Sequence, residues 1–160
     1  MTINVGDKIP SAKLRHMTLE GPKEITTDEL FKGKKVVLFA VPGAFTPTCS
    51  MKHLPGFVGK ADAIRTKGVS EIVCLSVNDA WVMEAWGKEQ KVGDKVHMVA
   101  DGNGDLTKAL GLDTDISAAG LGLRSKRYSM VVDNGTVTHL NVEKPGAFEV
   151  STAETILTQV

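Results

Sequence analysis

Short apolar runs alternate with amphipathic stretches along most of this 160-residue chain. Residues 36–41 are continuously apolar and are bounded by glycine and proline, which predicts a strand buried on both faces of a sheet. The apolar runs at residues 71–77 and 97–100 predict two further buried strands. Three such strands separated by longer segments are typical of parallel pairing.

Helical spacing of apolar residues fills the gaps between these strands. We expect a helix over residues 46–67 that is interrupted near Pro55-Gly56, a helix through Trp81 and Trp86 that Asn78 and Asp79 can cap, and a short helix over residues 105–110 that Gly111 ends. The two tryptophans are expected in core and rim packing.

The last third of the chain follows a different pattern. Residues 128–133 and 136–140 predict a hairpin around the turn Asn134-Gly135, and residues 152–160 a last helix. We expect residues 120–123 to be a flexible connector, and the first 30 residues suggest short extended pieces and turns. The order of elements predicts one α/β domain over residues 1–160, a thioredoxin-like sandwich with a mixed central sheet and helices on both faces.

Composition excludes several classes of protein. The chain has 19 Lys+Arg against 19 Asp+Glu, so it lacks the basic patch that nucleic acid or an anionic membrane attracts. Its apolar runs are far shorter than the ~20 residues of a membrane helix, and its first residues lack the apolar core expected of a signal peptide. Two cysteines cannot form a disulfide scaffold and favour a reducing compartment. We therefore expect a cytoplasmic protein with no nucleic-acid or membrane partner.

One segment, residues 41–50, combines features that favour chemistry. Thr46 is a good N-cap, Pro47 suits the first helical position, and Cys49 then falls at the third. Free amide N–H groups and the positive end of the helix dipole converge there, which favours thiolate over thiol. Pro42 and Pro47 stiffen the loop. The segment predicts a nucleophilic cysteine, against the alternative of a buried, inert one.

Other function classes stay open at this point. A cysteine hydrolase or acyltransferase would pair Cys49 with a distant histidine, and a binding or chaperone module would need no reactive thiol. A thioredoxin-type oxidoreductase is disfavoured because the chain lacks a Cys-x-x-Cys pair. His16, His97 and His139 have no ligand spacing with either cysteine, so we expect no metal site. His53, one helical turn after Cys49, is expected to form a local hydrogen bond just before Pro55.

The pattern Pro42-x-x-x-Thr46-x-x-Cys49 resembles the active-site signature of the peroxiredoxins, thiol peroxidases of thioredoxin-like fold. The longer string Val-Pro-Gly-Ala-Phe-Thr-Pro-Thr-Cys-Ser is similar to the type II branch, which includes the fifth mammalian type with plant and bacterial relatives. The resemblance covers residues 5–160, with further matching strings at residues 55–57, 74–79, 100–102, 110–112 and 124–130.

The resemblance implies a reaction without a cofactor. Cys49 would attack one oxygen of hydrogen peroxide or an alkyl hydroperoxide and become a sulfenic acid. The hydroxyl of Thr46, the backbone N–H groups of Thr48 and Cys49, and the guanidinium of Arg127 would stabilise the charge on the reacting oxygens.

Two further residues beside the site are implied less directly. Arg124 would support the site, in preference to a merely solvated basic turn. Phe45 would face the substrate or a partner subunit.

The resemblance also bears on how the enzyme is reduced. Cys74 lies in a predicted buried strand, so we expect it to be a core residue rather than a resolving cysteine. The stretch that carries the resolving cysteine in mammalian members has no cysteine here. The resemblance therefore implies reduction by an external thiol, either glutathione with glutaredoxin or thioredoxin, and a homodimer.

Overall fold

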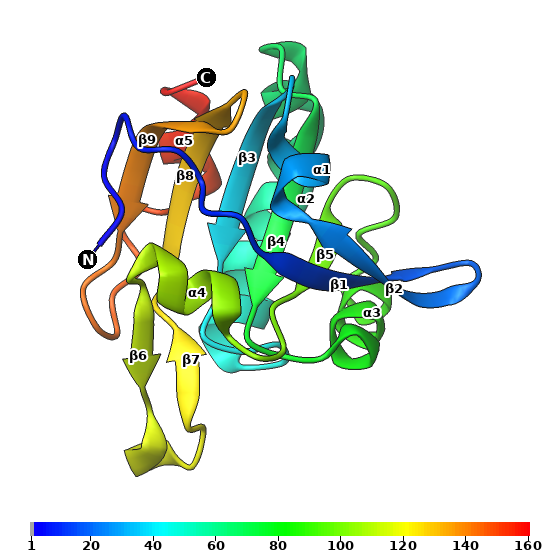
Figure 1. Ribbon diagram of the computed structural model, residues 1–160, viewed down its shortest axis with the longest axis vertical. Helices are drawn as coiled ribbons and strands as arrows, with labels where there is room; N and C mark the ends of the chain where they lie inside the picture. Colours follow the sequence, from blue (N-terminus) through cyan, green and yellow to red (C-terminus); the bar gives the residue numbers. More distant parts are fainter. Residues whose placement is uncertain (1) are drawn as a thin grey trace.

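A seven-stranded mixed sheet organises the computed structural model, which describes residues 2–160 (Figure 1). Its strands lie in the order β2-β1-β5-β4-β3-β8-β9. Their bounds are β1 Lys13–Thr18, β2 Gly21–Thr26, β3 Lys35–Ala40, β4 Glu71–Ser76, β5 His97–Ala100, β8 Tyr128–Asp133 and β9 Thr136–Val142.

The centre of the sheet matches the strands that the apolar runs predict. β3, β4 and β5 pair in parallel, whereas β8 pairs antiparallel with β3 and begins opposite its last residue, Ala40. The predicted hairpin β8–β9 turns at Asn134 and Gly135, both at positive φ. The loop that follows β3 and the residues just before β8 therefore lie close together, at the carboxyl-terminal end of β3.

Helices cover both faces of this sheet, as predicted. One core joins the sheet to α2 (Leu54–Thr66), α3 (Ala80–Glu89) and α5 (Ala153–Leu157). A second core on the opposite face joins it to α1 (Thr27–Phe31) and α4 (Asp105–Leu110). The thioredoxin-like sandwich is confirmed, and each helix buries its apolar stripe against a strand of the central sheet.

The helix after β3 differs from its prediction. Helical structure begins at Pro47 and passes through Pro55 and Gly56 without a break. The irregularity lies one turn earlier, where Cys49–His53 forms a π-helical turn. Proline has no N–H for an α-helical bond, and the wider turn just before it accommodates this loss. The turn also buries both Cys49 and His53.

Two hairpins lie outside the predicted elements. β1 and β2 pair antiparallel at one edge of the main sheet, and β6 (Asp113–Asp115) pairs with β7 (Leu123–Ser125) in a separate two-stranded sheet. The second hairpin contains a short 3₁₀ turn, Ser117–Ala119, and the connector predicted at residues 120–123. Figure 1 shows it projecting from the body of the molecule below α4.

None of the helices within residues 2–160 has the length and apolar character needed to cross a membrane.

Candidate active site

The loop between β3 and the π-helical turn carries the predicted site and is fastened from several sides. The amide of Ala44 donates to Oδ1 of Asn78 at 3.0 Å. Asn78 therefore holds this loop, while Asp79 alone caps α3 by accepting from the amide of Val82. Trp86 donates from Nε1 to the Ser50 hydroxyl at 3.0 Å, which ties the turn after Cys49 to α3.

Cys49 is fully buried and has two polar neighbours. The Thr46 Oγ1 lies 2.9 Å from its Sγ, and Nη2 of Arg127 lies 3.1 Å from the same sulfur. The sulfur thus faces a hydroxyl and a guanidinium, both able to donate to it. A thiolate in this position accepts two hydrogen bonds, one of them charge-assisted.

The Thr46 hydroxyl has only one proton and two acceptors in reach. Its oxygen also lies 2.7 Å from the carbonyl of Gly43. With a neutral thiol, the hydroxyl donates to Gly43 and accepts the S–H proton; with a thiolate, its proton turns toward the sulfur. Thr46 therefore suits both protonation states of Cys49. The expected contact between Thr46 and the cysteine is present.

The strand register brings Arg127 to this loop. Tyr128, the first residue of β8, pairs with Ala40, the last residue of β3. Arg127 therefore leaves the sheet beside the start of the loop, and its side chain reaches Cys49 across 78 residues of sequence. The guanidinium is a rigid fork, so its second nitrogen, Nη1, is available for another partner.

The other predicted residues surround these three. Arg124 does not contact the sulfur; it donates to the carbonyls of Leu121 at 2.9 Å and Pro42 at 3.4 Å, and so holds the hairpin β6–β7 against the loop. Phe45 adopts a strained backbone with φ 66 and is 51% exposed. Thr48 is exposed.

A cavity of ≈ 400 Å³ lies next to the loop that carries Cys49, although Cys49 itself does not line it. Pro42, Thr48 and Arg127 are part of its lining. The remaining walls come from the hairpin β6–β7 and from residues 143–147. The cavity therefore reaches Arg127, whose Nη2 contacts the sulfur of Cys49.

The expected local hydrogen bond of His53 is wrong. Its Nε2 lies 2.9 Å from the carbonyl of Ser151, 98 residues away, and its Nδ1 lies 2.9 Å from Nη1 of Arg127. A carbonyl only accepts and a guanidinium only donates, so the proton is on Nε2 and the ring is neutral. Burial, followed by the charge of Arg127, lowers the pKa of His53 to about 3. The sequence around Pro55 contains no signal for these distant partners.

Cys74 lies in the middle of β4 and is fully buried, as expected for a core residue. It packs in the same apolar core as Cys49, and both thiols are free. Burial raises the pKa of the Cys74 thiol well above its usual range, and the neighbouring Cys49 raises it further. The Cys74 thiol is therefore a poor nucleophile near neutral pH.

The tryptophans separate into two environments. Trp86 is fully buried in the core, as expected, whereas Trp81 is 63% exposed on the first turn of α3. The expected core or rim packing holds for Trp86 only.

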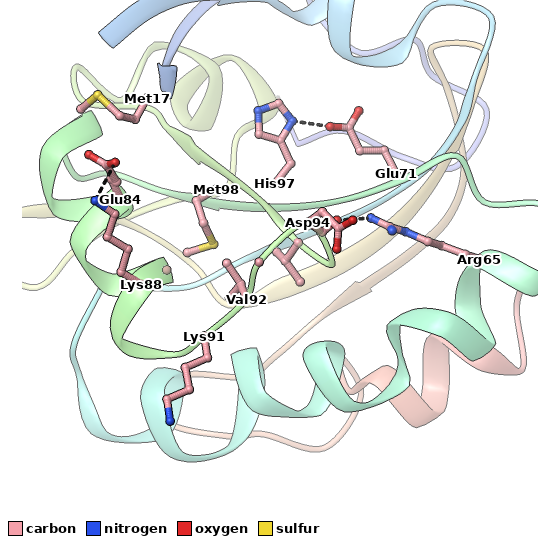
Figure 2. Close-up of a pocket in the computed structure, with 13 residues that line it drawn as sticks. Met17, Arg65, Glu71, Glu84, Lys88, Lys91, Val92, Asp94, His97 and Met98 are labelled. Carbon is pink, nitrogen blue, oxygen red and sulfur yellow. Dashed lines mark hydrogen bonds and ion pairs between the residues drawn. The ribbon is translucent and has the colours of Figure 1, made fainter. Parts of the chain in front are cut away.

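A second hollow, of ≈ 480 Å³, lies at the amino-terminal ends of β4 and β5 (Figure 2). Three of its charged side chains have partners: Glu84 pairs with Lys88, and Arg65 donates to the Asp94 backbone carbonyl. Among the described residues that line it there is no cysteine. The hollow therefore lacks a nucleophile of the kind found at Cys49.

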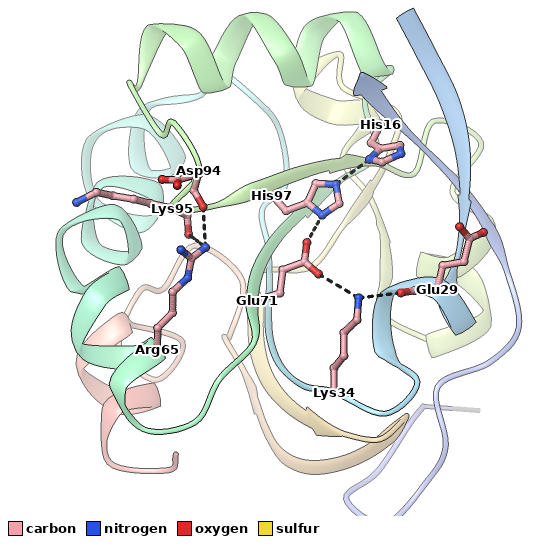
Figure 3. Close-up of polar contacts among 8 residues, drawn as sticks. All are labelled: His16, Glu29, Lys34, Arg65, Glu71, Asp94, Lys95 and His97. Atoms are coloured by element: carbon pink, nitrogen blue, oxygen red, sulfur yellow. Dashed lines mark hydrogen bonds and ion pairs between the residues drawn. The ribbon is translucent and has the colours of Figure 1, made fainter. Parts of the chain in front are cut away.

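A polar chain borders that hollow (Figure 3). His97 bonds through Nδ1 to Glu71, and its Nε2 lies 2.8 Å from Nδ1 of His16. Since the carboxylate accepts the Nδ1 proton of His97, a neutral His97 accepts from His16. Within residues 2–160, no group of three or more His, Cys, Asp or Glu side chains is arranged to hold a metal ion.

The hydrogen-bonded side chains of His16, His97 and Glu71 predict that the folded protein loses stability in mild acid. Burial, followed by the charge of His97, lowers the pKa of His16 below 6.5, although the carboxylates of Glu29 and Glu71 oppose the shift. The unfolded chain therefore binds more protons than the folded one as the pH falls through 6.5, and stability falls. We expect the urea midpoint to decrease between about pH 8 and about pH 5.5.

The variant His16→Asn isolates this contribution. Protonation of the buried His53 also lowers stability as the pH falls. The measured quantity is therefore the difference between the variant and the wild type in how steeply the urea midpoint falls with pH. A smaller decrease in the variant supports the assignment, and equal decreases contradict it.

A single buried thiol, placed at the start of a helix on a thioredoxin-like sheet and flanked by a hydroxyl and a guanidinium, defines a class of thiol-based enzymes. Comparison with known proteins gives the family. The family model described as Redoxin matches residues 4–157.

Two curated relatives and one solved structure are similar over nearly the whole chain. Peroxiredoxin-2E, chloroplastic, from Arabidopsis thaliana is 50% identical over 160 residues, covering 98% of this chain and 68% of its own length. Peroxiredoxin-2D from the same plant is 49% identical, covering 97% and 96%. The crystal structure of reduced Prx3 in complex with H₂O₂ from Vibrio vulnificus has a TM-score of 0.95 at 55% identity and covers 99% of both chains. The chain belongs to the peroxiredoxins, a family of thiol peroxidases, and to their type II branch.

Proposed function

We propose that this protein reduces hydrogen peroxide and small alkyl hydroperoxides at Cys49 and is re-reduced by an external thiol. The observation that carries the proposal is the pair of donors on the buried sulfur, Thr46 at 2.9 Å and Arg127 at 3.1 Å. Both stabilise a thiolate, and both are placed to follow charge from the sulfur to a bound peroxide.

The first step forms one bond and breaks one. The Cys49 thiolate attacks the terminal oxygen of the peroxide, an S–O bond forms, and the O–O bond breaks. The distal oxygen leaves as hydroxide or alkoxide and takes a proton, giving water or an alcohol and a sulfenic acid on Cys49. Arg127 stabilises the developing negative charge, and the Thr46 hydroxyl reorients its proton as the sulfur loses charge.

The remaining predicted residues have supporting roles in the proposal. Pro42 and Thr48 line the path to the sulfur, with the amides of Thr48 and Cys49 as further donors to the peroxide. Arg124 holds the loop through the Pro42 carbonyl. Phe45, exposed at the edge of the loop, is available to a substrate or to a partner subunit.

A cysteine hydrolase or acyltransferase is less well supported. Such an enzyme needs a histidine that accepts a proton from Cys49. The nearest candidate, His53, donates to Ser151 and accepts from Arg127, so neither ring nitrogen is free for the sulfur.

Stopped-flow mixing of the reduced protein with hydrogen peroxide tests the proposal directly. Trp86 contacts Ser50, the residue after Cys49, so its fluorescence should report the oxidation. A rapid change that is complete at one equivalent of peroxide, together with trapping of a sulfenic acid on Cys49, is expected. Labelling by acyl electrophiles without peroxide consumption would favour the hydrolase alternative.

The position of Cys74 supports re-reduction by an external thiol. An external thiol attacks the sulfenic acid, water leaves, and a mixed disulfide forms that a second thiol resolves. Glutathione with glutaredoxin, or thioredoxin, would supply these thiols. Cys74 is an unsuitable resolving cysteine because it sits in the central strand β4 with its ionisation suppressed.

We expect Cys74→Ser to retain most of the peroxidase activity when glutathione and glutaredoxin supply the electrons. After one equivalent of peroxide, mass spectrometry of the wild type should find a sulfenic or glutathionylated Cys49. A dominant Cys49–Cys74 disulfide, with activity lost in Cys74→Ser, would show instead that the sheet opens during turnover.

A homodimer in the cytoplasm completes the proposal. Three large apolar side chains near the loop, Phe45, Met51 and Trp81, are 51%, 76% and 63% exposed and would suit a subunit interface. Light scattering during size exclusion should give about twice the 17.1 kDa chain mass, and a monomer would contradict this part. Both thiols are free, which fits a reducing compartment; cell fractionation tests the location.

A further inference from the structure

The segment from Glu143 to Ser151 lies far from Cys49 in the sequence but is linked to it by hydrogen bonds. Nη2 of Arg127 contacts the sulfur, Nη1 contacts His53 at 2.9 Å, and His53 contacts the Ser151 carbonyl at 2.9 Å. His53 and Ser151 are 1% and 0% exposed. The orientation of the guanidinium is therefore set on the side away from the sulfur.

Glu143 determines where the Ser151 carbonyl lies. Its Oε2 accepts from the amides of Glu149, Val150 and Ser151 at 2.8, 2.9 and 2.8 Å, and from the Ser151 hydroxyl at 2.7 Å. These hydrogen bonds lower the pKa of Glu143, although burial opposes them. A carboxylate that is 6% exposed and holds four donors fixes the turn at residues 149–151.

The same glutamate is anchored to Arg127 through the main chain. The amide of Glu143 donates to the Arg127 carbonyl at 2.9 Å. The contacts thus close a ring that runs from the Arg127 side chain through His53, Ser151 and Glu143 back to the Arg127 backbone. The aromatic ring of Phe148 packs against this hydrogen-bonded network. Its centroid lies 5.0 Å from the centroid of the His53 imidazole and 5.8 Å from Cζ of Arg127.

We propose that His53 and Glu143 are positioning residues for the peroxidase reaction: a neutral His53, aimed by the turn that Glu143 holds, keeps Nη2 of Arg127 directed at Cys49. The inference rests on the proposed function of Cys49 and adds to it. His53 accepts from one nitrogen of the guanidinium, and the rigidity of the fork transfers that constraint to the other nitrogen. A misplacement of about 1 Å can cost ~10²-fold in rate.

The positioning role of His53 requires that its imidazole be neutral. A charged imidazolium would have no lone pair for Arg127 and would place a second cation beside it. The Ser151 carbonyl keeps the proton on Nε2, so Nδ1 stays an acceptor. This explains why a histidine can lie against an arginine in a buried site.

Four variants of the full chain test the proposal, with two measurements on each. His53→Leu removes both hydrogen bonds, while His53→Gln retains one donor and one acceptor. Glu143→Gln removes the charge that holds the turn, and Glu154→Gln removes an exposed charge on α5 as a matched control. The measurements are the second-order rate of oxidation by hydrogen peroxide and the fraction of Cys49 present as thiolate near neutral pH.

We expect His53→Leu to lower the oxidation rate by ~10- to 10²-fold and to lower the thiolate fraction. Glu143→Gln should shift both quantities in the same direction by a smaller factor, His53→Gln should retain most of the wild-type values, and Glu154→Gln should match the wild type. A folded His53→Leu protein with wild-type rate and wild-type thiolate fraction would overturn the inference.

A measurement on the wild type keeps the test independent of folding defects. Nitrogen NMR of His53 should show a neutral ring protonated on Nε2 from about pH 8 down to about pH 5.5. A ring protonated on Nδ1, or one that becomes charged in this range, would overturn the proposal. If instead the wild type does not consume peroxide, the proposed function fails while the thiolate and NMR results still decide the positioning role.

Discussion

Replacing Cys49 with serine is expected to abolish peroxide reduction and to leave the fold intact. The serine oxygen is smaller than sulfur and fits the same buried position between Thr46 and Arg127. Its hydroxyl remains protonated near neutral pH and does not attack a peroxide oxygen. The measurement is peroxide consumption with glutathione and glutaredoxin, together with the urea midpoint as a check of folding.

The matched control for this result is Cys74→Ser, which makes the same atomic change in the same core. Turnover should survive in that variant and disappear in Cys49→Ser. Substantial peroxide consumption by Cys49→Ser would refute the proposed function as a whole, because no other described thiol remains except the buried Cys74.

The second large effect is expected for Arg127→Ala. This variant loses a charged donor to both the sulfur and the reacting oxygen, so the oxidation rate should fall by ~10²- to 10³-fold, by analogy with removal of one oxyanion donor. The fraction of Cys49 ionised near neutral pH should fall as well. Stopped-flow fluorescence and thiolate absorbance measure the two quantities.

Arg124→Ala provides the comparison, since Arg124 holds the loop through the Pro42 carbonyl at 3.4 Å without touching the sulfur. Its effect should be much smaller, and it should leave the thiolate fraction unchanged. If the two variants behave alike, or if Arg124→Ala is the more severe, the roles assigned to these two arginines are wrong.

The parts of the fold that could be predicted are those in which burial dictates the sequence. β3 and β4 are buried on both faces, and their continuous apolar runs follow from that position. The hairpin β8–β9 was predictable because Asn134 and Gly135 suit a turn that needs positive φ at both positions.

The hairpin β1–β2 could not be predicted because β2 is an edge strand and β1 joins the rest of the sheet through a single pairing with β5, Arg15 with Ala100. β1 is Lys-Leu-Arg-His-Met-Thr, in which only Leu14 is fully buried, and β2 buries only Ile25. Such strands carry little apolar pattern, since most of their side chains remain in contact with solvent. Their pairing is decided by the rest of the sheet rather than by local sequence.

The candidate site divides in the same way. Thr46 directly precedes the helical residues and lies three positions before Cys49, so their contact follows from local spacing. The resemblance places Arg127 at the site, and the structure supplies the reason: the register of β8 on β3 brings it to the loop. The sequence does not reveal the partners of His53, because Arg127 and Ser151 are 74 and 98 residues away.

The complete burial of Cys49 affects the competition between re-reduction of its sulfenic acid and further oxidation by peroxide. In the proposed cycle, a small peroxide would reach the sulfur in the closed structure, whereas a tripeptide or protein thiol would first need the π-helical turn Cys49–His53 to unwind locally. Until the turn unwound, the sulfenic acid would be exposed only to a second peroxide, which would oxidise it to the sulfinic acid. On this proposal, the rate of unwinding would set how readily excess peroxide inactivates the enzyme. A substitution that stabilises the closed turn should make the enzyme more sensitive to excess peroxide.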